Sequence, residues 1–399
     1  MATPLETSVG SPALPLRSTV VDVDLDAIAS NLAALRKRGG GEVIAVVKAD
    51  AYGHGIEAVA ETLAEAGAAM LAVITLEEAV VLRRAGITMP VLVLFGAVDR
   101  AEAEAAVAFD CTLVVWDLKR ARLVDEAAAA AGRTARVHIK VDTGLTRLGA
   151  PVAEAPARVK AIRELRHLEV EGLFTHLATA DEPDVSEDRQ QLARFAEVLR
   201  AIGEPPRWVH AAASAGVAAF GAIAGCNAVR PGLSLYGLHT APHLVSALAL
   251  RPALEWRSRV HRVATVAKGT GVSYGLEYRM PRSGRVATVP VGYGDGLPRV
   301  LGERGRVLAG GRALPFAGRV CMDLVMLDVT DLPATREGDE VVMIGTQDGA
   351  RQTADDLAAA AGTISFEIVA GIRRRVPRRY HRSGRIVATR TLADGYQRL

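Results

Sequence analysis

Aromatic residues, cysteines and long uncharged apolar runs are scarce in this chain of 399 residues, and each shortage excludes something. Phe, Trp and Tyr make up only 4% of the residues, so Ala, Val and Leu must fill the core. The three cysteines, Cys111, Cys226 and Cys321, lie far apart and match no metal-ligand spacing. They predict reduced thiols, a cytoplasmic location and no metal site.

An excess of charge of one sign is also lacking. The formal net charge of +3 is too small to indicate a nucleic-acid partner, and the arginines of residues 373–382 predict a solvated face or ligand contacts. Charges interrupt every apolar run before the roughly 20 residues that a membrane-spanning helix needs, so we expect no membrane association. Residues 1–17 lack the pattern of a signal peptide, and we expect a flexible tail there.

The chain instead contains a repeated alternation of strand-like runs and amphipathic helical stretches. Eight strands separated by helices are typical of a closed parallel (β/α) barrel of the TIM type. An open doubly wound sheet would alternate similarly, but the count of eight and the absence of GxGxxG after the first strand favour the barrel. We therefore predict an α/β barrel over residues 18–250, with a separate strand near residues 20–25. The predicted barrel strands are 42–48, 70–75, 91–96, 112–116, 135–141, 168–176, 208–212 and 229–236.

The pattern changes near Arg251. Helical runs nearly vanish, and short Val-, Thr- and Arg-rich segments follow each other with Gly or Gly-Asp turns. This pattern predicts a mainly antiparallel β domain over residues 251–395. We expect one helix at 353–361 and a last strand at 385–392.

The first barrel strand, EVIAVV, ends in Lys48. A lysine in an apolar interior loses hydration, so its pKa falls and its neutral, nucleophilic amine becomes accessible. An isolated lysine at a strand end usually extends into solvent instead. Further polar residues follow other predicted strands, and the carboxyl ends of barrel strands meet at one mouth. These residues are Tyr52, Lys140, Asp142, Arg147, His176, Ser214 and Arg230.

Two uses of the lysine fit this setting. Lys48 could form a Schiff base with a substrate carbonyl, or it could hold pyridoxal phosphate. The second use requires a phosphate cradle, for which Tyr52, Ser214 and the amides near Gly232 are candidates. Arg230 would face the pyridine nitrogen and leave it unprotonated, because arginine only donates. Such a cofactor is a weaker electron sink, which favours removal and return of the α-proton over transamination.

Seven motifs resemble alanine racemase, a barrel-type (fold-type III) pyridoxal phosphate enzyme, in order and spacing over roughly residues 18–395. The motifs are AVVKADAYGHG, KVDTGLTRLG, THLATAD, VRPGLSLYG, VSYGLEY, VGYGDG and GRVCMD. The resemblance implies a homodimer in which the strand near residues 20–25 packs with the C-terminal domain. It also implies interconversion of L-alanine and D-alanine, with D-alanine supplied to cell-wall peptidoglycan.

The resemblance implies a role for each matching residue. Lys48 tethers pyridoxal phosphate and acts as one base, and Tyr274 of the partner subunit acts as the other, linked through His176 to Arg230. Arg147 and the Met322 amide bind the substrate carboxylate. A carbamylated Lys140 orients Arg147, and Tyr293 with the CMD segment that ends at Asp323 narrows the entrance.

The chain departs from the family pattern at two positions. Ala213 replaces an asparagine before the phosphate-binding serine, and Arg374 stands where a second phosphate-binding tyrosine is usual. Ala213 removes one polar contact with the phosphate, and Arg374 either binds the phosphate more strongly or points away from it, so both changes affect the affinity for the cofactor. The main alternative is an amino-acid racemase of broader specificity. Three other classes fit less well. A related decarboxylase would need no second base, and a single-barrel pyridoxal phosphate carrier would have no C-terminal domain. An aldolase that uses a Schiff base without a cofactor would need no phosphate cradle.

Overall fold

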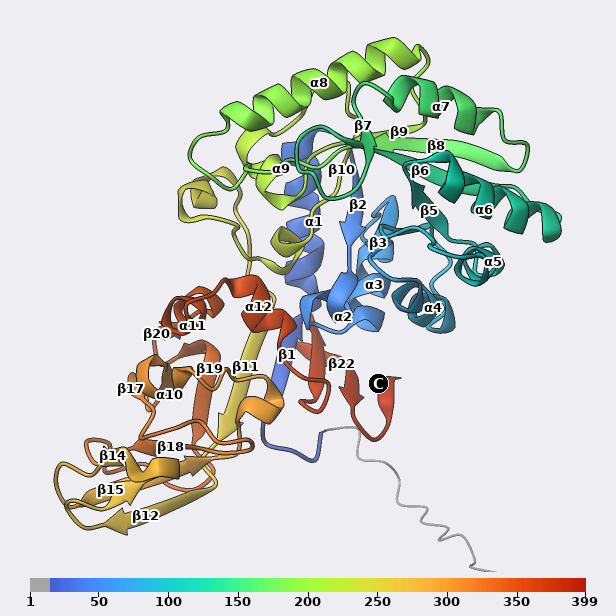
Figure 1. Ribbon diagram of the computed structural model, residues 1–399. Helices are drawn as coiled ribbons and strands as arrows, with labels where there is room; N and C mark the ends of the chain where they lie inside the picture. The colour runs from blue at the N-terminus through green and yellow to red at the C-terminus, as the bar shows by residue number, and fades with distance from the viewer. Residues whose placement is uncertain (1–14) are drawn as a thin grey trace, which may run out of the picture. The chain divides into compact units, whose positions relative to one another are not determined.

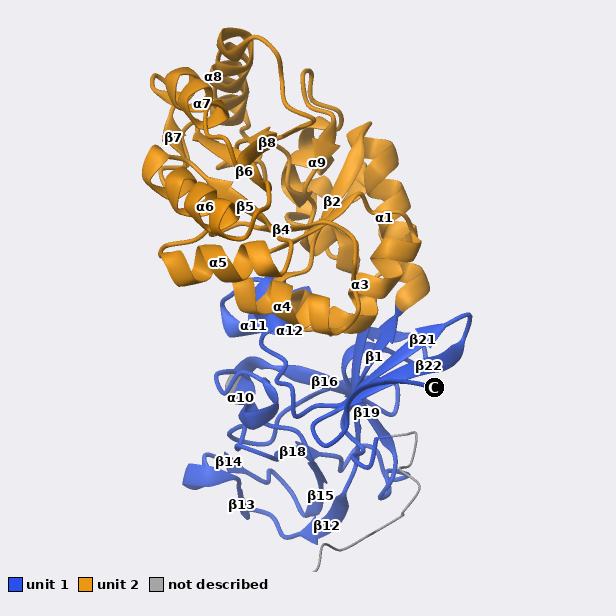
Figure 2. Cartoon of the chain, turned by 90° about the vertical axis from the view of Figure 1, so that its right-hand side faces the viewer, with its two compact units in different colours: residues 1–24, 254–399 blue, residues 25–253 orange. Residues whose placement is uncertain are grey.

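The computed structural model describes residues 15–399, which form two compact units (Figure 2). Unit 2 is Leu25–Ala253, and unit 1 combines residues up to Asp24 with Leu254–Leu399. Residues 1–14 of the expected tail lie outside the described residues. The division into domains at residues 17 and 250 stays a prediction. No helix within residues 15–399 is long and apolar enough to cross a membrane.

Unit 2 contains the predicted eight-stranded barrel (Figure 1). Every pairing around the ring is parallel, and the ring closes between β5 and β6. The strands, in spatial order, are β2 (Glu42–Val46), β3 (Met70–Val73), β4 (Val91–Val93), β5 (Thr112–Val115), β6 (Ala135–Asp142), β8 (Leu168–Phe174), β9 (Trp208–His210) and β10 (Ala228–Val229). A short strand, β7 (Ala150–Pro151), pairs with β6 outside the ring.

The last barrel strand is shorter than the sequence predicted. β10 stops at Val229, and residues 233–236 form a 3₁₀ turn, η1 (Leu233–Tyr236). Pro231 explains the early end, because proline lacks the N–H that a strand ladder needs. The chain after Val229 is therefore a loop at the end of the barrel.

Helices surround the barrel in Figure 1. Side-chain caps start several of them: Thr75 and Glu78 form a capping box on α4, and Asp99 caps α5. Each helix buries one apolar face, and buried Val, Leu, Ile and Ala make up most of β2 to β5, as the scarcity of aromatics required, whereas β6, β8 and β9 also bury polar side chains. The helices are α1 (Leu25–Gly39), α3 (Ile56–Glu65), α4 (Leu76–Arg84), α5 (Arg100–Ala108), α6 (Leu118–Ala130), α7 (Ala155–Arg163), α8 (Ser186–Ile202) and α9 (Ser214–Phe220).

Unit 1 is mainly antiparallel, as predicted. Its large sheet has the order β17-β16-β19-β11-β1-β21-β22-β23, with one parallel pair, β1 to β21. A second sheet has the order β12-β15-β18. The first sheet contains β17 (Arg312–Pro315), β16 (Arg306–Ala309), β19 (Glu340–Gln347), β11 (Leu254–Arg259), β1 (Val20–Asp24), β21 (Arg378–Arg382), β22 (Arg385–Thr391) and β23 (Gly395–Arg398), and the second β12 (Arg262–Val266), β15 (Gly284–Val289) and β18 (Val325–Asp328).

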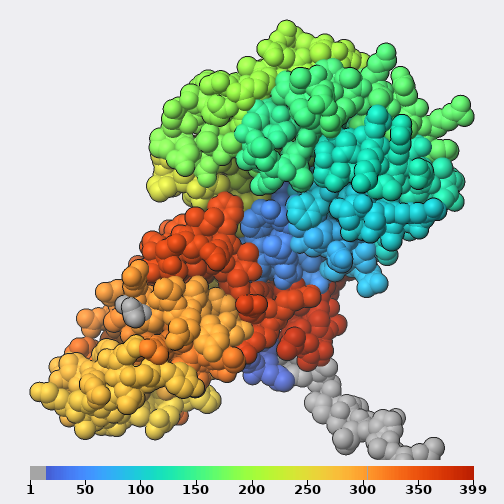
Figure 3. All heavy atoms as spheres, in the orientation of Figure 1, coloured from blue at the N-terminus to red at the C-terminus, as the bar shows by residue number. Residues whose placement is uncertain are grey.

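The helical content of unit 1 exceeds the prediction. The expected helix is α11 (Ala354–Ala361), and α10 (Leu301–Arg304) and α12 (Ser365–Ala370) are additional. The sequence did not indicate α10 and α12, because four and six residues are too short for a clear helical period. In the space-filling view the yellow and orange segments of this unit lie against one another (Figure 3).

Candidate active site

Lys48 does not end a strand, contrary to the prediction; it opens a left-handed turn. β2 stops at Val46, and α2 (Lys48–Tyr52) follows. All four residues 49–52 have φ between 52° and 57°. None of them is glycine, and left-handed backbone costs an L-residue roughly 1–2 kcal/mol. Strain of this kind collects at functional sites.

Carboxylates on both sides hold the turn in place. Glu78 Oε1 accepts a hydrogen bond from the Ala49 N–H at 2.6 Å. Asp50 Oδ1 accepts one from the Ile56 N–H at 3.0 Å, which ties the turn to the start of α3. The backbone after β2 is therefore fixed by these side-chain bonds together with the turn's own backbone hydrogen bonds, such as Ala51 N–H to the Val47 carbonyl at 2.9 Å, and Lys48 is presented from this bonded segment.

Arg230 is the buried centre of the barrel end. Its side chain lies over the Phe174 ring, 4.8 Å from the centroid. One guanidinium nitrogen lies 2.5 Å from His210 Nδ1, and another lies 2.8 Å from His176 Nδ1. Arginine has only donors, so both histidine nitrogens must be acceptors. The predicted link between Arg230 and His176 is thus a direct hydrogen bond.

Positive charges crowd this end of the barrel and perturb one another. Burial, then the charge of Arg147, lowers the pKa of Lys48. Burial, followed by the charges of Arg230 and Arg147, lowers the pKa of Lys140 to about 8. His176 has a pKa held well below its usual value by burial and by the same cations. Both amines therefore reach their neutral forms more readily than an exposed lysine does.

Ser214, Gly232 and Tyr52 form a small polar cradle. Ser214 Oγ accepts hydrogen bonds from the N–H groups of Gly232 at 3.0 Å and Ser234 at 3.2 Å. A Cβ at Gly232 would overlap the Tyr52 hydroxyl, so only glycine fits beside that oxygen. Burial raises the pKa of Tyr52 to about 12, so its hydroxyl stays protonated and can donate.

Arg147 is exposed on the loop after β6. Its charge lowers the pKa values of Lys48, Lys140 and Arg230, so its guanidinium lies near all three. Within residues 15–399 no hydrogen bond or ion pair joins the Arg147 side chain to a partner. A fixed fork of donors in this position suits a carboxylate ligand.

The other predicted site residues lie in unit 1. Tyr274 is 70% exposed and Met322 is 52% exposed. Backbone hydrogen bonds tie the loop of Tyr293 to Cys321 and Met322, with N–H to O distances of 3.0 and 2.8 Å. Ser273 Oγ donates to the Arg319 carbonyl at 2.7 Å, so the Tyr274 loop belongs to the same surface.

Arginine 375 and not Arg374 organises the chain after α12. Arg375 Nε donates to Asp295 Oδ1 at 2.7 Å, and another nitrogen donates to Asp323 at 2.5 Å. Arg17 makes a second ion pair with the buried Asp295. This network connects the loops of Tyr293 and Asp323, whereas Arg374 is exposed in a turn.

Unit 2 therefore brings together eight of the predicted residues at one end of the barrel, and unit 1 carries the other five. The sequence reading missed Glu78, His210 and Arg375. Glu78 lay in an ordinary helix start, and His210 lay within a strand. The eight residues are Lys48, Tyr52, Lys140, Arg147, His176, Ser214, Arg230 and Gly232; the five are Tyr274, Tyr293, Met322, Asp323 and Arg374.

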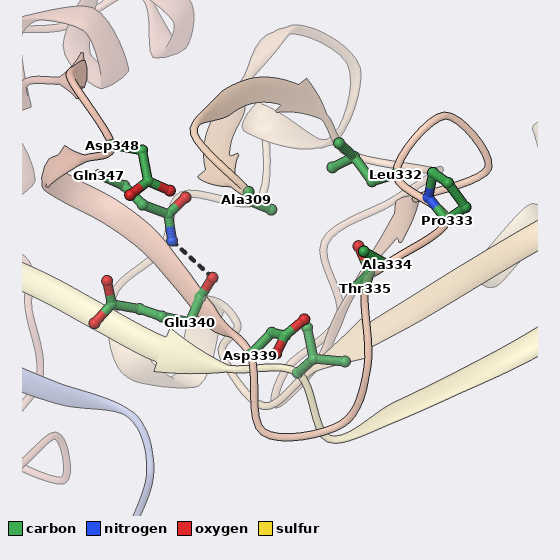
Figure 4. A pocket seen from close by; sticks show the side chains of 11 residues that line it. Ala309, Leu332, Pro333, Ala334, Thr335, Asp339, Glu340, Gln347 and Asp348 are labelled. Carbon is green, nitrogen blue, oxygen red and sulfur yellow. Dashed lines mark hydrogen bonds between the residues drawn. The ribbon is translucent and has the colours of Figure 1, made fainter.

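A separate groove of about 380 Å³ lies in unit 1 (Figure 4). Leu332 and Pro333 line one side, and Gln347 and Asp348 line the other. Glu340, another lining residue, is paired with Arg257. The described residues contain no group of His, Cys, Asp or Glu suited to a metal ion. The groove therefore offers no reactive cluster comparable with the barrel end.

Comparison with protein-family models gives two adjoining matches. The alanine racemase N-terminal domain matches residues 23–240, and the alanine racemase C-terminal domain matches residues 253–380. The chain is 42% identical to the alanine racemase of Halothermothrix orenii over 371 residues, covering 91% of this chain and 97% of the relative. It is 44% identical to that of Symbiobacterium thermophilum over 369 residues, covering 92% and 97%.

Solved structures agree with these matches. Alanine racemase from Bacillus anthracis with bound L-Ala-P superposes with a TM-score of 0.86 at 37% identity, covering 96% of this chain and 100% of that one. The enzyme from Streptomyces lavendulae, which produces D-cycloserine, gives a TM-score of 0.87 at 37% identity, covering 93% and 98%. Matched along both units in sequence and fold, the chain belongs to the alanine racemase family of isomerases.

Proposed function

We propose that this protein interconverts L-alanine and D-alanine with pyridoxal phosphate, using one base from each of two subunits. One observation carries the proposal: an amine of lowered pKa, Lys48, stands on a strained turn beside Arg230 and the polar cradle. A surface lysine would need neither the strain nor the cationic neighbours.

The charges of the barrel end fit such a cofactor. Besides burial, the charges of Arg147 and Arg230 lower the pKa values of Lys48 and Lys140, and within the described part of the chain only two carboxylates, Glu78 and Asp142, act in the opposite direction on these amines. A phosphate group and a substrate carboxylate would supply the missing negative charge. Tyr52 and Ser214 would hold the phosphate, with Arg374 as a further contact. The amide of Gly232 would join them by exchanging its bond to Ser214 Oγ for one to the phosphate. Ala213 contributes no polar side chain there.

The side chains of Lys48 and Arg230 determine how the cofactor would be tethered and how its ring would be contacted. Lys48 would anchor the cofactor covalently, since a neutral amine adds to an aldehyde. Arg230 only donates, so it would keep a pyridine nitrogen that it contacts unprotonated. The bound cofactor would withdraw electrons from the substrate's α-carbon and so acidify its proton.

Two opposed bases explain inversion. Lys48 Nζ would move the proton on one face of the α-carbon, acting on D-alanine. The hydroxyl of Tyr274 from the partner subunit would act on the other face, on L-alanine. His176 accepts from Arg230 through Nδ1, so a neutral His176 carries its proton on Nε2 and can donate to a tyrosinate oxygen. That donor would stabilise the tyrosinate, so that the deprotonated base is available nearer neutral pH.

Arg147 and Lys140 would place the substrate. Arg147 would bind the substrate carboxylate together with the Met322 amide. Lys140 is buried beside Arg147, and as an ammonium group it would repel that arginine. Carbamylation of Lys140 would replace this repulsion with attraction and orient Arg147.

A homodimer would bring Tyr274 to the neighbouring barrel. Unit 1 exposes Tyr274, Leu276, Tyr293, Met322 and Leu324 on connected loops. Exposed apolar groups gathered in this way mark interaction surfaces. Tyr293 and Asp323 would narrow the entrance at this interface. The three free cysteines support a cytoplasmic location, and the D-alanine formed would supply peptidoglycan.

The decisive test is incubation of the purified protein with L-alanine in deuterated water. We expect D-alanine to form, with deuterium at the α-carbon of the inverted product. Exchange without inversion would mean that one base alone works. Parallel incubations with L-serine, L-lysine and L-arginine distinguish an alanine enzyme from a racemase of broader range.

A further inference from the structure

A chain of buried polar side chains runs from Arg230 through the barrel interior. His210 Nδ1 faces Arg230, and His210 Nε2 lies 3.0 Å from His138 Nδ1. His138 Nε2 lies 3.9 Å from Glu171 Oε2. All four residues are buried, with Glu171 only 5% exposed. They come from β6, β8, β9 and the loop after β10, so the chain crosses the core of one rigid barrel.

The arginine fixes the position of every proton in this chain. Arg230 can only donate, so His210 Nδ1 carries no proton. A neutral His210 then has its proton on Nε2 and donates it to His138 Nδ1. A neutral His138 in turn has its proton on Nε2, which points toward Glu171. Burial holds the pKa of His210 well below its usual value and lowers that of His138, so both rings are neutral.

The chain must therefore end on an acceptor, and Glu171 is the group that meets this need. Within residues 15–399, His138 Nε2 and Glu171 Oε2 are both buried without a hydrogen-bond partner, and they face each other. Their 3.9 Å separation is slightly longer than a hydrogen bond, so a small closure would satisfy both atoms. A buried N–H left unpaired costs about 1–3 kcal/mol.

We infer that Glu171 is a positioning residue, which accepts the His138 Nε2–H and so holds His138, His210 and Arg230 in the orientation that the hydrogen bonds of the arginine set. The tautomer assignment follows from the barrel geometry together with the neutrality of both rings. Its consequence for proton transfer rests on the proposed function, because Arg230 acts there as the ring contact.

Neighbouring side chains hold Glu171 and the two histidine rings in place. Trp208 Nε1 donates to Glu171 Oε1 at 3.1 Å, which leaves Oε2 for the histidine. The ring of Phe174 stacks on His210 with centroids 4.7 Å apart and planes 10° apart. Gly172 gives the His138 ring its space, because a Cβ there would lie 2.5 Å from that ring.

Other charged groups face the carboxylate from outside the chain. Arg207 lies 3.6 Å from Glu171 Oε1. Burial raises the pKa of Glu171, but the neighbouring His138, the hydrogen bond from Trp208 and the charge of Arg136 lower it overall. Neither arginine can accept the His138 proton. A purely structural ion pair with Arg207 would make no use of Glu171 Oε2 as an acceptor for the His138 Nε2–H, and this difference can be measured.

The test uses full-length protein with ¹⁵N-labelled histidine, with signals assigned through the variants His138→Gln and His210→Gln. We expect both rings to be neutral and protonated on Nε2. A proton on Nδ1 of either ring, or an imidazolium, would overturn the inference. This measurement needs no activity, so it stays informative even if the racemase proposal fails.

Three variants connect the tautomers to turnover. Glu171→Leu removes the acceptor, Glu171→Gln keeps an acceptor oxygen without the charge, and Glu169→Gln is the control, an exposed glutamate on the same strand. We expect Glu171→Leu to lose the His138 Nε2 signal and to lower kcat roughly tenfold with KM unchanged, as partners of oriented histidines do elsewhere. Glu171→Gln should restore both the signal and most of kcat.

Two results would count against the inference. Glu171→Leu could keep the wild-type histidine signals and kcat, or Glu171→Gln could be as impaired as Glu171→Leu. If Glu171→Leu does not fold, the wild-type tautomers and the comparison of Glu171→Gln with Glu169→Gln still decide. An active enzyme with Nδ1-protonated rings would reject this role for Glu171 and leave the racemase proposal standing.

Discussion

A Cβ placed on Gly232 would overlap the hydroxyl oxygen of Tyr52. Space therefore requires the glycine. The space it leaves is occupied by a hydroxyl that we assign to the phosphate of the cofactor.

We predict that Gly232→Ala weakens pyridoxal phosphate binding by displacing that hydroxyl. Overpacking of this kind costs about 1–3 kcal/mol, which corresponds to roughly 5- to 150-fold in affinity. Titration of the cofactor-free protein with pyridoxal phosphate, followed by absorbance, measures the change.

Tyr52→Phe supplies the control, because it removes the oxygen that the new methyl group would strike. In the Gly232→Ala background, Tyr52→Phe should cost less affinity than it costs alone. Equal costs in both backgrounds would show that the methyl group does not act through Tyr52.

Exchange of subunits tests the shared site. Lys48→Ala should abolish the visible absorbance of the tethered cofactor, because no amine remains to hold it. Tyr274→Phe should keep that absorbance and lose activity from L-alanine. Mixed Lys48→Ala and Tyr274→Phe subunits should regain activity, since half of the sites in each mixed dimer then carry both bases.

The control for subunit mixing is a sample of each variant incubated alone through the same exchange procedure. Both should stay inactive. Failure of the mixture to recover, with exchange of subunits verified by mass, would argue that both bases come from one chain.

The barrel was predictable because its strands carry continuous β-branched runs between amphipathic helices. The same logic located Lys140, His176 and Ser214 at the ends of strands. It could not locate His210 or His138 as partners of Arg230, because a histidine within a strand looks the same whether or not another strand offers it a donor. Such contacts depend on closure of the barrel and not on local spacing.

The left-handed turn after Lys48 was also beyond sequence reasoning. Residues 49–52 read Ala-Asp-Ala-Tyr, and only the aspartate in that segment tolerates positive φ well. The long-range bond to Glu78 and the bond between Asp50 and Ile56 help to hold the conformation against the preference of these residues. In unit 1, Arg374 matched the family position, but the neighbouring Arg375 makes the ion pairs with Asp295 and Asp323.

Strain in that turn predicts an unusual stability change. Ala49 is exposed and has φ 52°, so Ala49→Gly should stabilise the fold by relieving part of the roughly 1–2 kcal/mol penalty. The greater flexibility of glycine in the unfolded chain offsets up to about 1 kcal/mol of this gain. The free energy of unfolding in urea is the measurement.

Ala129→Gly is the matched control, because Ala129 is exposed near the end of α6 with ordinary helical geometry. That change should destabilise the protein by up to about 1 kcal/mol. The two substitutions should therefore have opposite signs. A destabilised Ala49→Gly protein would mean that the turn carries no relievable strain.

Lys140 gives the stability of the protein a pH dependence that can be isolated. Its pKa falls from 10.5 to about 8 in the folded state, chiefly through burial. Between these values the unfolded chain binds more protons than the folded one, so the free energy of unfolding should rise with pH. The destabilisation caused by burying Lys140 is complete below about pH 8, and it is absent above 10.5, the pKa of this lysine in the unfolded chain.

Lys140→Met should reduce this slope while keeping the packing volume, and Lys48, whose pKa is also lowered, should account for part of the remainder. The measurement is urea unfolding across that pH interval in carbonate-free buffer, because a carbamate on the amine would remove its titration. Added bicarbonate should then flatten the wild-type slope and leave Lys140→Met unchanged. An unchanged slope in Lys140→Met would assign the pH dependence to another group, and an effect of bicarbonate on that variant would exclude Lys140 as the carbamylated residue.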